Sequence, residues 1–174
     1  MKNGKLLKRV FILSNNADRI CNSLKSMDNL EIYADNKLSE DNYDLIILYD
    51  YHETLPMNYI KNNNIIRVHN SLLPSFNTKT PIKDAYCSGV KVTGVTVHKV
   101  ENANLTGMIL TQYPVIIDIY THYDQLKSEL EELAEKIVPL VVKSILNDTI
   151  FDIVDFLYTP HSCNRCSGCE SCHK

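Results

Sequence analysis

The fold of this chain is decided by the stretch Arg67-Val68-His69-Asn70-Ser71-Leu72-Leu73-Pro74. It continues an apolar run, so residues 65–68 predict a buried β-strand with His69 at its carboxyl end. Side chains alternate between the two faces of a strand, which places Arg67 and His69 on the same face. In open α/β sheets ligands bind beyond the carboxyl ends of the strands. We therefore expect both side chains to line one cleft.

Apolar patterns on either side of this stretch alternate between strand and helix. Strands are predicted at residues 8–13, 30–33, 44–48, 65–68, 94–100 and 108–117, and helices at residues 18–26, 55–61, 80–88 and 124–146. Pro114 predicts a bend or an edge position in the last strand, and Pro139 predicts a kink or a division in the closing helix. This order predicts an α/β domain with an open, mostly parallel sheet and helices on both faces.

The composition of the chain fits one soluble globular domain. It has 174 residues, 44% of them hydrophobic, and a formal net charge of −3, a size at which a core forms without disulfides. The near-neutral charge provides no basic field for nucleic acid, and no apolar run approaches the roughly 20 residues of a membrane-spanning helix. The basic N-terminus lacks the apolar core of a signal peptide, so a cytoplasmic location is expected. The oligomeric state stays open.

Four of the six cysteines lie three residues apart near the C-terminus: Cys163, Cys166, Cys169 and Cys172. We therefore divide the chain into a domain at residues 1–158 and a cysteine-rich tail at residues 159–174. In a cytosolic protein such spacing favours metal ligation over disulfides. C-x₂-C-x₂-C runs are typical of iron–sulfur clusters, and four thiolates also suit a tetrahedral zinc site. The metal stays open, and a redox-active tail without fixed structure is the alternative.

Several motifs resemble those of the folate-dependent formyltransferases, the family of glycinamide ribonucleotide formyltransferase and the methionyl-tRNA formyltransferase catalytic domain. Residues 67–74 are similar to the active-site motif N-x-H-x-S-L-L-P, with His69 at the position of the family's His and Arg67 at that of its Asn. Residues 93–98 match T-G-V-T-V-H, and residues 105–110 resemble L-D-x-G-x-I-L. The resemblance implies the α/β fold of that family.

The resemblance also implies an activity, the transfer of a formyl group from 10-formyltetrahydrofolate as co-substrate to a small amine, most like phosphoribosylglycinamide formyltransferase. His69 would polarise the formyl group and handle protons, and Arg67 would donate to the oxyanion in place of the Asn. Leu105 or Asn104 stands at the position of the family's Asp, and neither accepts a proton at neutral pH. The alternative is a catalytically inactive protein of this fold that serves as a metal- or redox-linked binding module.

The implied folate loop falls on residues 49–52. Tyr49, Asp50 and Tyr51 are therefore candidate folate contacts together with Leu105, and the two tyrosines could either stack on a pterin or fill its pocket. His52 is expected to be solvated. The family's glycine-rich phosphate loop falls on residues 14–18, which contain no glycine and end in a carboxylate that would repel a phosphate.

Overall fold

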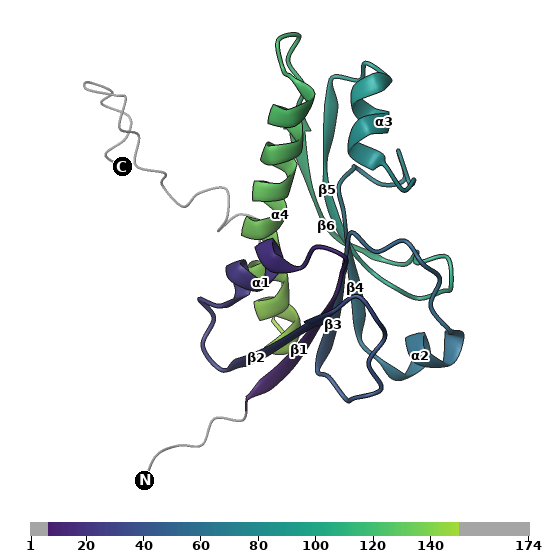
Figure 1. Ribbon diagram of the computed structural model, residues 1–174, viewed down its shortest axis with the longest axis vertical. Helices are drawn as coiled ribbons and strands as arrows, with labels where there is room; N and C mark the ends of the chain where they lie inside the picture. Colours follow the sequence, from purple (N-terminus) through teal and green to yellow (C-terminus); the bar gives the residue numbers. More distant parts are fainter. Residues whose placement is uncertain (1–6, 150–174) are drawn as a thin grey trace, which may run out of the picture.

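A computed structural model describes residues 7–149 and shows one six-stranded sheet. The strands are β1 (Lys8–Leu13), β2 (Leu30–Asp35), β3 (Leu45–Tyr49), β4 (Ile65–His69), β5 (Val92–Lys99) and β6 (Ile109–Ile116). The helices are α1 (Asp18–Leu24), α2 (Met57–Asn62), α3 (Pro81–Cys87) and α4 (Tyr123–Leu146). Figure 1 shows α1 and the long α4 on one side of the sheet and α2 on the other. The predicted α/β class is confirmed.

The sheet has the strand order β2-β1-β3-β4-β5-β6. β1 pairs in parallel with β2 and β3, and β3 pairs in parallel with β4, whereas β4–β5 and β5–β6 are antiparallel. The sheet is therefore open and mostly parallel, as predicted. Pro114 lies in the edge strand β6, where a missing backbone N–H is tolerated. Pro139 lies inside α4, which continues as one helix of 24 residues, so the predicted division of this helix is wrong.

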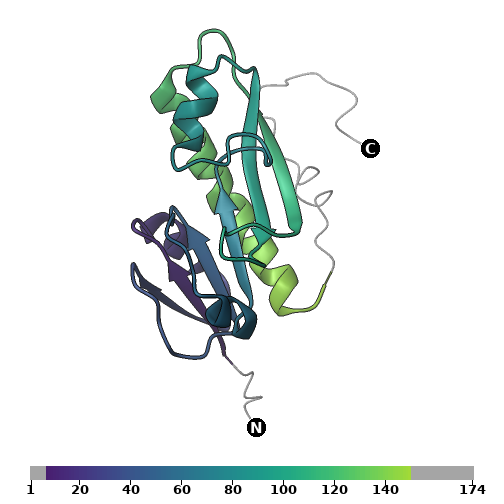
Figure 2. The same ribbon diagram turned by 90° about the vertical axis from the view of Figure 1, so that its right-hand side faces the viewer.

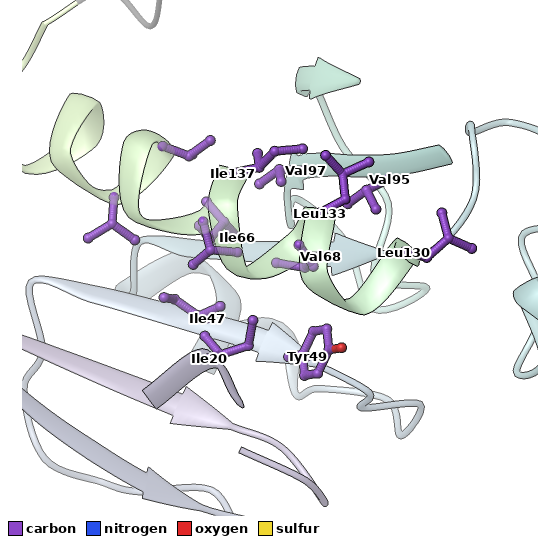
Figure 3. Packing of buried hydrophobic residues seen from close by; sticks show 14 of the residues in the cluster. Ile20, Ile47, Tyr49, Ile66, Val68, Val95, Val97, Leu130, Leu133 and Ile137 are labelled. Carbon is purple, nitrogen blue, oxygen red and sulfur yellow. The ribbon is translucent and has the colours of Figure 1, made fainter. Parts of the chain in front are cut away.

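The larger core fills the space between the sheet and α4. Ile66 and Val68 from β4 contribute to it, together with Val95 and Val97 from β5. Figure 3 shows these strand residues on the side of the sheet that α4 covers, opposite Leu130, Leu133 and Ile137. This packing fixes which face of β4 is apolar, and it leaves the alternate residues of β4 to the other face.

A second, smaller core lies on the opposite face of the sheet. It joins Ile46 and Leu48 of β3 to Ile60 of α2, and it ends with Val100 and Leu105 beyond β5. In Figure 2 the chain between β5 and β6 folds back beside β4. This second core covers only the amino-terminal part of β4, so the carboxyl end of that strand is free of it.

Helix α3 is positioned by contact with α4. The rings of Tyr86 in α3 and Tyr123 in α4 meet edge to face, with centroids 5.6 Å apart. On the same side of the sheet, Arg19 of α1 forms ion pairs with Glu131 at 3.6 Å and Glu135 at 2.7 Å. Helix α4 thus ties together α1, α3 and the sheet.

The proposed boundary at residue 158 and the four clustered cysteines lie outside the residues that the structure describes. Within residues 7–149 there is no helix whose length and apolar character would let it cross a membrane.

Gly94 in β5 is expected to be indispensable for the packing of β6 and of the segment after β4. A Cβ atom there would overlap the carbonyl oxygen of Tyr113 and lie 2.7 Å from Cδ2 of Leu72. We expect Gly94→Ala to lower the free energy of unfolding by about 2 kcal/mol or more, as overpacking does, when measured by urea denaturation.

Gly89→Ala is the matched control, since its Cβ would meet open space and only its φ of +69° opposes the substitution. That control should cost about 1 kcal/mol. If Gly94→Ala lowers the free energy of unfolding no more than the control does, then β5 and β6 do not approach each other as closely at Gly94 as described.

Candidate active site

Arg67 and His69 occupy the face of β4 that points away from α4. Both are buried, with 7% and 2% of their surface exposed. In the sheet register Arg67 lies between Leu48 of β3 and His98 of β5, and His69 lies opposite Thr96. The strand therefore has one wholly apolar face and one face that carries polar groups at its carboxyl end.

Hydrogen bonds from β5 and β6 hold the segment that follows β4. The hydroxyl of Thr96 donates to the Ser71 carbonyl at 2.6 Å and accepts the backbone N–H of Leu73 at 3.1 Å. The side-chain amide of Gln112 donates to the Leu73 carbonyl at 2.8 Å. The peptide bond between Leu73 and Pro74 is cis. The motif at residues 93–98 thus acts on the site by fixing residues 71–73.

His69 is held in one neutral form. Its Nε2 lies 3.0 Å from the carbonyl oxygen of Phe76 and must carry the proton, because a carbonyl only accepts. Burial lowers the pKa of His69 to about 4, against the opposing effect of the Phe76 hydrogen bond and with help from the charge of Arg67. At neutral pH the ring is uncharged, and Nδ1 is its hydrogen-bond acceptor.

Arg67 carries a charge that no carboxylate of residues 7–149 balances, because it belongs to none of the ion pairs found there. Its side-chain neighbour is His52, whose Nδ1 lies 3.5 Å from Nη2 of Arg67. The Nε2 of His52 lies 3.3 Å from Oδ1 of Asp50. Burial lowers the pKa of Arg67, with no other cause opposing it. The guanidinium is a desolvated cation at the end of β4.

Unfavourable backbone conformations gather around these side chains. Asp50, Phe76 and Leu105 have φ values of +49°, +53° and +56°, which non-glycine residues rarely adopt. Each costs on the order of 1–3 kcal/mol and persists only where the surrounding structure imposes it. Phe76 provides the carbonyl that fixes His69, so at least one of these conformations serves the site directly.

Two cavities meet at Arg67. The first, of about 250 Å³, is lined by the carboxyl ends of β3 and β4 and by the first halves of α3 and α4. The second, of about 270 Å³, is lined by residues 52–54, 77–79 and 103–105 as well as by Arg67. His52, Arg67 and Lys79 line both cavities. The result is a two-part cleft with Arg67 at the junction, which suits a reaction between two separately bound molecules.

The structure brings most of the predicted site residues together. Arg67, His69, Tyr49, Asp50 and Tyr51 all line the first cavity, whereas Leu105 lines the second. Only 5% of each tyrosine and 4% of Leu105 is exposed, so they offer little surface to a pterin and act mainly as packing. Their binding roles stay predictions.

His52 corrects one expectation. Its side chain is 25% exposed and contacts Arg67, so it is partly buried in the cleft rather than solvated. Its spacing of two from Asp50 was the available signal, because the two side chains meet when the segment turns at the positive φ of Asp50. His98 is buried as a strand residue, with Nδ1 2.8 Å from the Lys99 carbonyl. Among residues 7–149 no cluster of three or more His, Cys, Asp or Glu side chains has the arrangement of a metal site.

Comparison with known proteins places this chain in a family. The formyl transferase family profile matches residues 8–142. The chain therefore belongs to the formyl transferase family.

Individual relatives agree with this class. The chain is 37% identical to phosphoribosylglycinamide formyltransferase of Bacillus subtilis over 82 residues, 47% of this chain and 42% of the relative. It is 33% identical to formyltetrahydrofolate deformylase 2 of Arabidopsis thaliana over 106 residues, 58% of this chain and 31% of the relative. The aligned part thus spans less than half the length of each of these two relatives.

Solved structures of low sequence identity show the same fold. Phosphoribosylglycinamide formyltransferase from Anaplasma phagocytophilum superposes with a TM-score of 0.68 at 24% identity, covering 83% of this chain and 89% of the other. A 4-N formyltransferase from Francisella tularensis gives a TM-score of 0.70 at 15% identity, covering 82% and 70%.

Stability should fall as the pH is lowered below the ordinary pKa of histidine. His69 has a folded-state pKa of about 4 against 6.5 in the unfolded chain, so between these values the unfolded chain binds the extra proton. The stability present above pH 6.5 is therefore lost progressively down to pH 4. The shift corresponds to about 3 kcal/mol for His69. Burial also lowers the pKa of His98, which adds to the same slope.

Urea denaturation at several pH values measures how the free energy of unfolding changes with pH. The His69→Gln variant should show a smaller change than wild type. His122→Gln removes an exposed histidine and should reproduce the wild-type slope. An unchanged slope in His69→Gln would mean that His69 is not held neutral by burial.

Proposed function

We propose that this chain transfers a formyl group from 10-formyltetrahydrofolate to a small amine, in a reaction most like that of phosphoribosylglycinamide formyltransferase. One observation carries the proposal: Arg67 and His69 line the same cavity with complementary proton chemistry. Arg67 is a donor that cannot lose its proton, and neutral His69 has an acceptor nitrogen. Attack of an amine on a formyl carbon needs one group of each kind.

Arg67 acts on the oxygen of the formyl group. As the amine nitrogen forms its bond to the formyl carbon, the carbonyl π electrons move to oxygen. The guanidinium of Arg67 then donates hydrogen bonds to the developing negative charge. Such donors in a site shielded from water typically contribute about 10²–10³ in rate. Arg67 thereby takes over the role of the Asn that the family motif has at this position.

His69 acts on the proton of the attacking nitrogen. Its Nδ1 takes that proton as the amine becomes bonded to carbon, because Nε2 is already committed to the Phe76 carbonyl. The imidazolium then returns the proton to N10 of the departing tetrahydrofolate as the carbon–nitrogen bond breaks. His69 in this way takes the proton-handling role of the family's Asp, whose position Leu105 occupies in this chain.

The two-part cleft gives the formyl donor and the acceptor separate spaces on either side of Arg67. Asn16 lines the first cavity and follows β1, but two residues later Asp18 begins α1. Because a carboxylate there opposes a phosphate, a small amine is a better-supported acceptor class than a ribonucleotide. The cytoplasmic location remains a prediction from the sequence.

The second candidate is a protein of this fold that binds without catalysis. The replacement of the motif's Asn by Arg67 and of its Asp by Leu105 favours this alternative. Calorimetry with a reduced folate separates the two. Binding of the folate at micromolar concentration supports the proposed formyl transfer. No binding at millimolar concentration contradicts it and favours a protein that binds without catalysis.

Substitution of either polar group should reduce transfer, measured as formylation of glycinamide ribonucleotide and of simpler amines. We expect His69→Ala and Arg67→Met each to lower the rate by about 10²-fold or more. Arg9→Met removes a partly exposed arginine outside the cleft and should leave the rate unchanged.

A further variant distinguishes an enzyme adapted to Arg67 from a decayed one. Arg67→Asn combined with Leu105→Asp restores the family pattern, and it should raise the rate only if the present site is a weakened form of that pattern. A double variant that is slower than wild type, with folate binding intact, favours the proposed roles of Arg67 and His69.

The cysteine-rich tail is proposed to bind iron–sulfur or zinc, on the sequence spacing alone, since it lies outside the described residues. Protein purified anaerobically should contain about one equivalent of zinc, or about two to four equivalents of iron for a cluster. Truncation after residue 158 should remove this metal without changing the melting temperature of the domain. Metal content far below one equivalent in the full chain would show that the cysteines of the tail bind no metal.

A further inference from the structure

The charge of Arg67 is buried without an anion beside it in the described part of the chain. Only 7% of its surface is exposed, and it forms no ion pair with the carboxylates of residues 7–149. A buried charge that lacks a partner costs several kcal/mol. The guanidinium nevertheless borders two cavities, so an anion from solution has access to it.

The groups around Arg67 cannot supply the missing negative charge. Leu48 and His98 flank it in the sheet, and His52 contacts it through Nδ1. Three carboxylates line the two cavities, Asp50 and Glu131 in the first and Glu53 in the second. Asp50 contacts His52 and its side chain is 57% exposed, Glu131 is paired with Arg19, and Glu53 is exposed to solvent. Leu105, at the position of the family's Asp, lines the second cavity as an apolar wall.

We propose that Arg67 is the anchor of an anion-binding site that takes a small monocarboxylate of the size and charge of formate. The planar guanidinium presents paired N–H groups that match the two oxygens of a carboxylate. One monoanion neutralises one guanidinium, so binding turns an unpaired buried charge into a pair. Each cavity is large enough for a molecule of three heavy atoms.

A phosphate dianion fits this site less well than a carboxylate. Its second charge needs a second fixed cation next to Arg67, and the neighbours that share this face of the sheet are His69 and His98. Burial lowers the pKa of both, so they stay neutral at physiological pH. Lys79, Lys83 and Lys127 line the first cavity, and Lys79 also lines the second, but all three are exposed to solvent, where their charge is screened.

The inference goes beyond formyl transfer and holds without it, because it concerns a resting carboxylate and needs neither folate nor amine. If transfer also occurs, formate occupies the place where Arg67 would stabilise the oxyanion. It would then compete with the formyl donor.

The test measures the melting temperature and the heat of binding with sodium formate, against sodium chloride at equal ionic strength. A ligand of this size reaches at best a Kd on the order of 1 mM. At 20 mM, about twenty times that value, formate should raise the melting temperature of the wild-type chain by about 5 °C. Phosphate at the same ionic strength should raise it by less than half as much. No rise with formate, or an equal rise with phosphate, overturns the proposal.

Variants tie the effect to Arg67. Arg67→Met keeps the length of the side chain and should abolish the formate response, and without added anion its melting temperature should equal or exceed that of wild type. Arg67→Lys keeps the charge but loses the planar fork, and its Kd for formate should rise about 10-fold. Arg9→Met removes a partly exposed arginine that stacks on Tyr33 and Tyr43, and this variant should keep the full response. A response retained by a folded Arg67→Met variant would place the site elsewhere and overturn the assignment.

Discussion

The alternation of β4 between core and cleft is the constraint on which the site depends. Ile66 and Val68 are committed to the core under α4, together with Val95 and Val97 of the neighbouring strand. A shift of β4 by one residue would turn Arg67 toward α4 and would turn Ile66 and Val68 away from the core, so the register is strongly fixed. The directions of Arg67 and His69 follow from that packing. The chemistry at the carboxyl end of β4 is therefore positioned by the apolar face behind it.

The same region holds several interactions that oppose folding. Arg67 is charged without an ion pair among residues 7–149. Burial keeps His69 uncharged at pH values below the ordinary pKa of histidine, and three nearby residues have positive φ. None of these would be retained for stability alone, and such features gather at functional sites. The core under α4 offsets their cost through the burial of apolar side chains. This contrast between a well-packed core and a strained polar end indicates a site that is kept for binding.

Most of the fold was predictable from the sequence, because strand and helix periods are local properties. The run at residues 65–68 and the helical stripe of α4 are long enough to give the element, its buried face and its place in the order. Pro139 does not divide α4, since the tertiary contacts of α4 on both sides of it keep the helix continuous, and the predicted kink stays a prediction. The joint lining of one cavity by Arg67 and His69 follows from strand alternation. His52 was misjudged, because its contact with Arg67 depends on the backbone turn at Asp50, which no periodicity signals.

The departures from the family motif have a common electrostatic effect. Arg67 in place of Asn and Leu105 in place of Asp each make the cleft one charge more positive than the family pattern would. A protonated amine is repelled by such a site. Two like charges 4 Å apart at an effective dielectric constant of 20 interact by about 4 kcal/mol. An amine bound near Arg67 therefore has a lowered pKa and enters as the free base. Only one proton then remains to be removed during attack, and a single neutral imidazole suffices for it. In the proposed reaction the missing carboxylate and the added arginine act together, because the charge that stabilises the oxyanion also lowers the pKa of the amine, which loses its extra proton to solvent before it reacts.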